Sequence, residues 1–278
     1  MGHPSILIVG AGRLATALGR GLALAGWRVA LAPRSARGRA ALRRHRLAEA
    51  PLEAAPEFQL LFLAVPDDAV EEACRAAAPH LRAGQAVAHG AGALTLAPLD
   101  PARRCGAQPG SLHLLQALAG GEVERGGYAA LAGEGRARTL LARAARDLGL
   151  RTVVVPERGR ARYHAAAVVA SNLAMALADL AVECWTRAGA PPEAALPALV
   201  PLLRGAVENL AARGLPGALT GPASRGDAGT VARQLALLSG EDREVYRLLS
   251  RRIVKLARAG GLDPAKARAV ERALREPR

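Results

Sequence analysis

The stretch ILIVGAGRLA at residues 6–15 decides the fold, because it joins four apolar residues to a G-x-G-x-x-A turn. The apolar run predicts a strand that is buried on both faces, as in a parallel sheet. The turn leads into a helix that we expect from Leu14 to Ala25. A strand, a glycine turn and a helix in this order are typical of a loop that binds the diphosphate of a dinucleotide.

Each position of this turn has a role in that interpretation. Gly10 permits the tight turn, Gly12 allows the backbone to approach a pyrophosphate, and Ala15 keeps the helix close to the strand. Arg13 and Leu14 complete the loop, where free N–H groups and the positive end of the helix attract phosphate. We therefore predict that these five residues form the cofactor-binding loop. The alternative is a glycine turn that only packs a helix against a strand.

The remaining pattern predicts an α/β protein with two domains. Short apolar runs at 27–31, 60–65 and 86–88 alternate with helical stretches, which indicates a Rossmann fold, a doubly wound parallel sheet with helices on both faces. We assign residues 1–156 to this NADP-binding domain. Residues 157–278 are rich in Ala and Leu at helical spacing, so we expect an all-helical domain that serves the substrate site and dimerisation.

The segment after the second predicted strand favours NADP over NAD. NAD-binding domains usually place an acidic residue about 20 residues beyond the glycines, but here no Asp or Glu occurs before Glu49. Arg34 offers a guanidinium for the additional 2′-phosphate and Ser35 offers a hydrogen bond. Arg37 is a second candidate for this phosphate, and the alternative is that one or both arginines belong to a solvated start of the next helix.

A third strand ends at Val65 and Pro66, at the edge where a doubly wound sheet forms its binding crevice. We expect the backbone of these two residues to line the nicotinamide side. Asp68, with Glu71 three residues later, predicts a capping box for the following helix, so we interpret Asp68 as structural.

Composition excludes several classes of protein. The formal charge is +14, but arginines are scattered along all 278 residues and aromatics make up only 3%, so we expect no nucleic-acid partner. Cys74, Cys105 and Cys184 have no metal-ligand spacing, and we predict no metal site and a reducing, cytoplasmic location. Ser171, Asn172 and Asp179 interrupt the longest apolar segment, which argues against a membrane span.

Several further motifs resemble those of one bacterial group. These are LAVPDD at 63–68, HGAGA at 89–93, SLHLLQ at 111–116, YHAAA at 163–167 with SN at 171–172, and in the C-terminal part LRG at 203–205, TGP at 220–222 and RGD at 225–227. The sequence thus resembles the Rossmann-like proteins whose C-terminal helical domain has no known function. That group is similar in plan to pyrroline-5-carboxylate reductase, ketopantoate reductase and deazaflavin-dependent NADP reductase. The resemblance implies the fold and a nicotinamide cofactor but no particular substrate.

The chain departs from the group at three places. Ala91 stands where a Ser is common and Leu114 where a Pro is common, so no hydroxyl contact is expected at position 91. Related reductases often have a Lys at the head of the first long helix with an Asn one or two turns later. This chain has His164 and Asn172 and no Lys near them.

His164 and Asn172 are our predicted catalytic residues. They lie eight positions apart, so on a helix both face broadly the same way. His164 would donate a proton or orient the substrate, and Asn172 would donate a hydrogen bond to substrate or cofactor. The alternative is a local structural role for each. His113 and Gln116 follow a predicted strand and are candidate substrate contacts, with His89 next, although ordinary loop hydrogen bonds would also account for them.

Two features of the C-terminal half have simpler interpretations. Asp227 is expected to cap a helix, and a role of Arg225 or Asp227 at the inter-domain cleft stays open. The small side chains of the helices from Ala165 onward favour close helix packing and hence a homodimer.

We therefore predict an NADP-dependent oxidoreductase that reduces a small keto or imine substrate at the inter-domain cleft. The alternative is a protein that binds NADP without turnover, as a sensor or scaffold. A dehydrogenase that runs in the oxidative direction has the same sequence signature.

Overall fold

The computed structural model describes residues 3–118 and 121–275. Contacts divide the chain into two compact units, one ending at Leu173 and the other beginning at Ala174. The first unit is built around a β-sheet. In the second, the described residues form helices and no strand, as the Ala/Leu pattern predicts.

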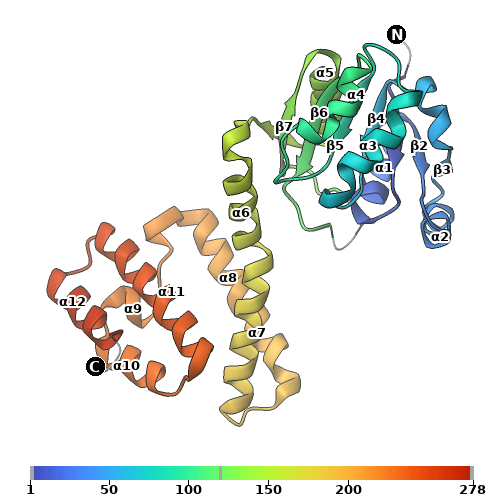
Figure 1. The fold of residues 1–278 in the computed structure, drawn as a ribbon. Coiled ribbons are helices and arrows are strands. Elements are labelled where there is room, and N and C mark those ends of the chain that lie inside the picture. Colours follow the sequence, from blue (N-terminus) through green and yellow to red (C-terminus); the bar gives the residue numbers. More distant parts are fainter. Residues whose placement is uncertain (1–2, 119–120, 276–278) are drawn as a thin grey trace. The chain divides into compact units, whose positions relative to one another are not determined.

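An eight-stranded sheet forms the centre of the first unit (Figure 1), with the order β3-β2-β1-β4-β5-β6-β7-β8. All pairings are parallel except that of β6 with β7. The order reverses at β1, between β2 and β4, which is the point where doubly wound sheets bind ligands. The strands are β1 (Ser5–Val9), β2 (Arg28–Ala32), β3 (Ala48–Glu49), β4 (Leu60–Leu63), β5 (Ala86–His89), β6 (Gln108–Leu114), β7 (Tyr128–Gly133) and β8 (Arg151–Val153).

The antiparallel pairing of β6 with β7 is a feature that the sequence pattern did not predict. A parallel neighbour requires a crossover connection, usually a helix. Between Leu114 and Tyr128 the described residues contain no α-helix. The chain therefore reverses direction, and β7 runs back along β6.

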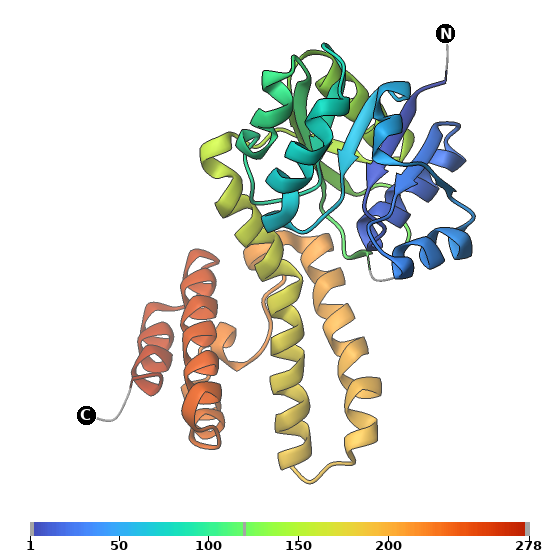
Figure 2. The ribbon, with the colours of Figure 1, turned by 45° about the vertical axis from the view of Figure 1, so that its right-hand side comes forward.

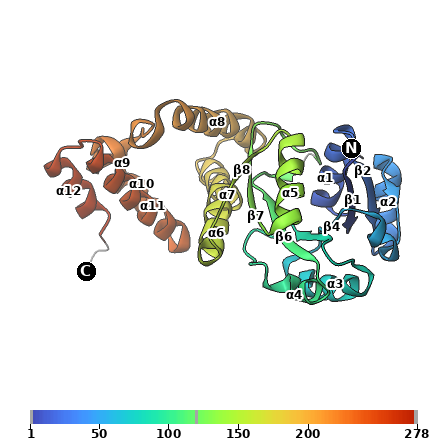
Figure 3. The ribbon, with the colours of Figure 1, turned by 90° about the horizontal axis from the view of Figure 1, so that it is seen from above.

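Helices cover both faces of the sheet, as expected for this class (Figure 3). Residues of α1 and α5 pack in one apolar layer, and residues of α3 and α4 pack in the other. β4 serves both layers, because Leu60 and Phe62 point to the first and Leu61 and Leu63 to the second. The α-helices of this unit are α1 (Arg13–Leu24), α2 (Ala36–His45), α3 (Val70–Ala77), α4 (Asp100–Arg104), α5 (Gly135–Asp147) and α6 (Arg160–Ala170), and the 3₁₀ helices are Leu52–Glu57, Asp67–Ala69, Ala78–His80, Ala97–Leu99 and Glu157–Gly159.

The predicted capping box at Asp68 is wrong. A 3₁₀ turn over Asp67–Ala69 precedes α3, so the residue at the helix N-cap is Ala69, and no side chain caps the helix there. The extra turn shifts Asp68 away from the capping position. Asp68 therefore does not have the structural role that we assigned to it.

The division between the two units follows Leu173 rather than residue 156. The composition changes at 156, but the start of α6 packs against the first unit. Arg160 is 1% exposed and its Nη2 donates to the carbonyl oxygen of Ala91 at 3.1 Å. The whole of α6 and the first residues of the next helix, up to Leu173, therefore belong to the first unit.

The described part of the second unit consists of α7 (Asn172–Arg187), whose first two residues belong to the first unit, and of the five helices α8 to α12. Figure 2 shows α7 in yellow and the long α8 in orange. The final helices share a small apolar core that includes Val231, Leu235 and Val254. Asp227 caps α10 by accepting a hydrogen bond from Thr230 N at 3.0 Å, which confirms the predicted cap. The helices are α8 (Pro192–Gly217), α9 (Pro222–Arg225), α10 (Ala228–Ala236), α11 (Gly240–Ala259) and α12 (Pro264–Ala273).

One helical segment, Glu157–Arg187, is long and apolar enough at 31 residues to cross a membrane, by length and composition only. None of its most apolar part is buried within the protein. Ser171, Asn172 and Asp179 interrupt the run. An apolar helix of this kind needs a cover, either lipid or another protein surface.

Replacement of Phe62 tests the importance of the central strand. The Phe62 side chain is fully buried on β4, so Phe62→Ala should lower the free energy of unfolding by about 3–5 kcal/mol in a chemical denaturation experiment. Leu24→Ala is the control, because Leu24 is 88% exposed and its replacement should change stability by no more than about 0.5 kcal/mol. Equal effects of the two substitutions would contradict the assignment of β4 to the core.

Candidate functional site

The glycine loop has a backbone that only glycine accommodates at its first position. Gly10 has a φ of 117°, and a Cβ there would collide with the carbonyl oxygen of Ala64 on the neighbouring strand segment. The N–H of Gly10 donates to the carbonyl oxygen of Ala32 at 3.0 Å. The loop is thus held between β2 and β4, at the switch point of the sheet.

Gly12 is the N-cap of α1, and beyond its own chain neighbours no atom of the described residues lies within 4 Å of the position where its Cβ would stand. No side chain caps this helix end. The backbone at Gly12 therefore faces open space, as required for close approach by a phosphate. Ala15 is fully buried in α1 and packs in the core layer, so its contribution is the close packing of helix on strand rather than a direct contact.

A cavity of about 850 Å³ extends from this loop to the start of α2. Arg34, Ser35 and Arg37 line it, together with the predicted loop residues Gly10, Gly12 and Arg13, and Val65 and Pro66 line its other side. The Ser35 Oγ accepts from Gly38 N at 3.1 Å and caps α2. Its hydroxyl hydrogen remains able to donate to a ligand.

Arg44 and His45 also line this cavity, from the last turn of α2, and our sequence analysis missed them. Arg44 lies seven positions after Arg37, two helical turns, so both side chains stand on one face. This spacing of seven residues could have predicted from the sequence that Arg44 lies on the same helical face as Arg37. The wall of the cavity near α2 is therefore strongly basic.

A second cavity of about 550 Å³ continues the first. The two share Gly12, Arg13 and the segment 64–66, and Leu14 is added as a lining residue. On the other side the second cavity is lined by Gln116 and Asn172. It lies where the strand ends of β1 and β4 meet the segment after β6.

A third cavity of about 370 Å³ adjoins the second, sharing with it Gln116, Ala117, Ser171 and Asn172. It is lined by residues of β6 and its following loop, and by one face of α6 with the start of α7, all in the first unit. Both predicted catalytic residues, His164 and Asn172, line it, as does His113. Small apolar side chains of α6, including Ala166, Ala167 and Val168, form most of the helical wall.

His113, Tyr163 and His164 form a polar corner at this cavity. The Nδ1 of His113 lies 2.9 Å from the Tyr163 hydroxyl. The rings of His113 and His164 meet edge to face with centroids 5.5 Å apart. Gly92 lies directly against both imidazoles, so a Cβ at that position would collide with them. The bare glycine backbone thus allows the two rings to approach each other.

Burial perturbs several groups of this corner. Desolvation lowers the pKa of His113 to about 4, and the nearby charges of His164 and Arg160 act in the same direction. Burial raises the pKa of the Tyr163 hydroxyl, while Arg160 opposes this rise. Near neutral pH, His113 is therefore an uncharged imidazole and Tyr163 an intact phenol.

Tyr163 and Arg160 are functional candidates that sequence reasoning missed. Tyr163 lines the third cavity. Arg160 is buried, and its Nε and Nη1 have no hydrogen-bond partner among the described residues, as is also the case for the Nδ1 of His164. Their positions one and four residues before His164 place them on or next to its helical face, and this was the only signal in the sequence.

Gln116 and His89 have structural tasks. The Gln116 amide donates through Nε2 to the carbonyl oxygen of Glu124 and accepts at Oε1 from Glu124 N at 3.1 Å, which closes the loop after β6. His89 is fully buried; its Nδ1 accepts from Ala91 N at 3.2 Å, so its Nε2 donates to the carbonyl oxygen of Thr95 at 2.9 Å. Neither imidazole nitrogen is left over for a ligand.

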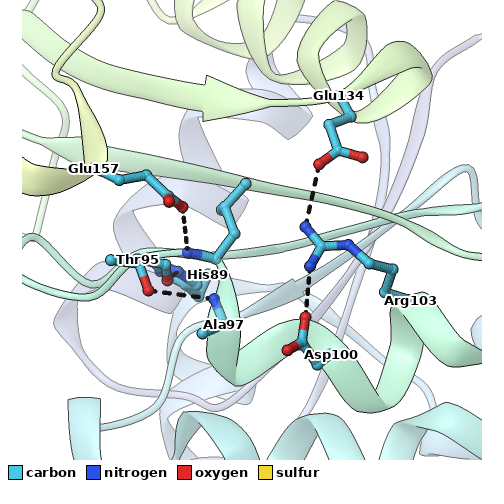
Figure 4. Close-up of polar contacts among 8 residues, drawn as sticks. His89, Thr95, Ala97, Asp100, Arg103, Glu134 and Glu157 are labelled. Atoms are coloured by element: carbon cyan, nitrogen blue, oxygen red, sulfur yellow. Dashed lines mark hydrogen bonds and ion pairs between the residues drawn. The ribbon is translucent and has the colours of Figure 1, made fainter.

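Figure 4 shows how this loop after β5 is held. Leu96 N lies 3.4 Å from a carboxylate oxygen of Glu157, and Ala97 N donates to Thr95 Oγ1 at 3.3 Å. Arg103 pairs with both Asp100 and Glu134. The segment that carries Gly92 against the two imidazoles is therefore anchored at both ends.

Two family models match the chain. Residues 3–114 match the Rossmann-like domain, and residues 128–253 match a domain of unknown function, DUF2520. The chain thus combines a Rossmann-like domain with a DUF2520 domain, which confirms the resemblance seen in the motifs. A comparison with curated proteins gave no match.

Solved structures share the fold over nearly the whole chain. A proposed NADP oxidoreductase from Bacteroides fragilis is 23% identical, with a TM-score of 0.73, over 90% of this chain and 98% of the other. The pyrroline-5-carboxylate reductase of Streptococcus pyogenes is 17% identical, with a TM-score of 0.61, over 97% and 96%. An imine reductase variant from Myxococcus stipitatus, in complex with NAD⁺, is 20% identical, with a TM-score of 0.60, over 99% and 100%. At these identities the likeness establishes the fold.

The perturbed imidazole predicts a specific pH dependence of stability. The pKa of His113 is about 4 in the folded chain and about 6.5 when unfolded, so between these values the unfolded state binds more protons. Stability should therefore fall as pH drops from about 6.5 to 4, and the lowered pKa of buried His89 acts in the same direction.

Urea unfolding across this range measures the effect. His113→Gln should flatten the dependence, whereas His3→Gln, at an exposed position, should leave it unchanged. An unaltered slope in His113→Gln would show that His113 titrates normally in the folded protein.

Proposed function

We propose that this protein binds NADPH and reduces a small compound with a C=O or C=N group. One observation carries the proposal. Three adjoining cavities run from the arginines near α2, past the glycine loop, to the polar corner of His113, Tyr163 and His164. A trough that is basic at one end and carries proton donors at the other suits a phosphorylated dinucleotide with a substrate beyond it.

The residues present fit this cofactor. The open backbone at Gly12 and the uncapped start of α1 suit the pyrophosphate. Arg34, Arg37 and Arg44 line the far end, where guanidinium groups match a 2′-phosphate in charge and shape. No Asp or Glu lines this cavity among the described residues, so the group that would favour the free ribose hydroxyls of NAD is missing. The backbone of Val65 and Pro66 would lie beside the nicotinamide.

The chemistry needs two components. When bound, the reduced nicotinamide supplies a hydride to the carbon of the C=O or C=N group. The protein must supply one proton to the oxygen or nitrogen. His164 and Asn172, which line the same cavity, would orient the substrate or donate the hydrogen bond. Asn172 keeps its amide donors for this task, because its Oδ1 lies 3.0 Å from the Ser171 hydroxyl.

A non-catalytic NADP-binding protein is the second candidate, and one observation favours it. The related reductases often have a Lys where this chain has His164 and no Lys nearby. A panel of ketones and imines, followed through nicotinamide absorbance, separates the two. Tight NADPH binding without turnover of any compound would favour a sensor.

We also propose that the chain forms a homodimer through its second unit. α7 has no buried residue, and large apolar side chains on α7 and α8 are exposed, among them Met175, Leu202 and Val207. Charged residues such as Asp179 and Arg204 interrupt these surfaces, which disfavours lipid as the cover. A second copy of the chain presents the same apolar helices, so that one interface would bury the exposed apolar side chains of both copies.

Cofactor selectivity tests the NADP assignment. In calorimetric titrations NADPH should bind more tightly than NADH. Arg34→Ala and Arg44→Ala should each weaken NADPH binding roughly tenfold to a hundredfold, the value of one charged hydrogen bond, and leave NADH unaffected. Arg39→Ala is the matched control, since Arg39 lies on α2 but does not line the cavity. Equal affinity for the two nucleotides would refute the choice of NADP.

Sedimentation tests the dimer. The wild-type chain should sediment as a dimer at micromolar concentration, and Val207→Glu should shift it toward the monomer by placing a charge in the buried interface. Leu237→Glu should remain dimeric, because Leu237 is an exposed residue at the C-cap of α10 and lies outside α7 and α8. A wild-type monomer would exclude this interface.

A further inference from the structure

The charges around the third cavity have one sign. No Asp or Glu lines any of the three cavities of the trough in the described part of the chain. The basic groups His113 and His164 line the third cavity, and Arg160 is close enough to influence the ionisation of both His113 and Tyr163. The described side chains that line the polar corner are therefore basic or neutral, and none of them is a carboxylate that could contact a bound cation.

Arg160 is one source of this positive field, together with the neighbouring His164. Arg160 is buried, one nitrogen donates to the carbonyl oxygen of Ala91, and the two other nitrogens lack partners among the described residues. The carboxylate that acts on it is Glu157, whose Oε1 is also engaged by Leu96 N at 3.4 Å. A buried guanidinium that is only partly compensated acts over several ångströms in a medium of low dielectric constant. It favours negative charge in the cavity and opposes positive charge.

Carbonyl and imine reduction place opposite demands on such a field. As a carbonyl carbon accepts hydride, its oxygen develops negative charge, which preorganised donors and cations stabilise. An imine is more basic and is usually reduced as its protonated, cationic form, which calls for a nearby carboxylate. The sign of the field therefore distinguishes the two substrates that the proposed function leaves open.

We propose that the third cavity binds an uncharged carbonyl compound, with the Tyr163 hydroxyl donating to the carbonyl oxygen. This inference rests on the proposed reductase function and chooses between its two substrate classes. Tyr163 lines the cavity and lies 2.9 Å from the Nδ1 of His113. The small apolar side chains of α6 form the cavity wall that would contact the apolar part of the bound carbonyl compound.

Tyr163 is the better proton donor of the His113–Tyr163 pair. His113 is uncharged near neutral pH, because burial lowers its pKa to about 4, so it has no acidic proton to give. The phenol is intact, and Arg160 acts to stabilise its anion. In the proposed reaction the C=O group becomes an alcohol. The carbonyl carbon gains a hydride from NADPH, which becomes NADP⁺, and the carbonyl oxygen gains the proton of the Tyr163 hydroxyl. The resulting phenolate then takes a proton from water.

Binding of two unreactive ring compounds tests the inference without turnover. The NADPH complex is titrated by calorimetry with 2-pyrrolidinone, an uncharged lactam with a carbonyl oxygen, and with pyrrolidine, a cation of the same ring size near neutral pH. We expect the lactam to bind at least tenfold more tightly. Tyr163→Phe should reduce lactam affinity about tenfold and leave NADPH affinity unchanged.

A matched pair of variants isolates the role of charge. Asn172→Asp introduces a carboxylate into the cavity with almost no change of shape, and it should weaken lactam binding and strengthen pyrrolidine binding, so that the tenfold preference disappears or reverses. Asn172→Ala removes the amide without adding charge and should keep the preference for the lactam.

The outcomes separate the inference from the function on which it rests. Equal or tighter binding of pyrrolidine to the wild-type complex overturns the carbonyl assignment, as does a complex that binds neither compound. Unchanged lactam affinity in Tyr163→Phe overturns the role of the phenol. If NADPH itself does not bind, the proposed function fails first, and the inference fails with it.

Discussion

The contact between the backbone of Gly10 and the carbonyl group of Ala64 is the constraint on which the site depends. With φ at 117° and no room for a Cβ, the chain turns sharply after β1 and directs the start of α1 toward the switch point of the sheet. The N–H of Gly10 fixes the same turn to Ala32 on the other side. Both neighbours of β1 thereby set the position of the loop, and the open backbone at Gly12 follows from it.

The charge distribution along the trough is the second organising feature. Arginines of the loop after β2 and of α2 supply positive charge at one end of the trough. The buried Arg160 supplies positive charge near the other end, at the polar corner. The intervening cavities contain no acidic lining residue in the part of the chain that the structure describes. Such a channel suits a polyanionic cofactor and a substrate that gains negative charge as it reacts.

Much of the fold follows from short-range pattern. The apolar run at 6–9, the glycine turn and the Ala/Leu periodicity after residue 157 each predict their element, because strand and helix periodicities are local properties. The antiparallel β7 and the failure of Asp68 as a cap were not predicted. Both depend on details of a connection, a missing crossover helix in one case and an extra 3₁₀ turn in the other, which composition does not reveal.

The glycine loop and the basic residues that line the cavity beside it could be predicted from residue order, because they lie within neighbouring strand–turn–helix segments. The substrate end could not. The roles proposed for Tyr163 and Arg160 depend on their contacts with His113 on β6 and with the backbone of Ala91. Both contacts join residues that are far apart along the chain. Likewise, a histidine such as His89 looks the same in sequence whether it faces a ligand or is enclosed by its own loop. Burial and hydrogen-bond partners separate these cases, and both arise when segments distant in the chain pack together.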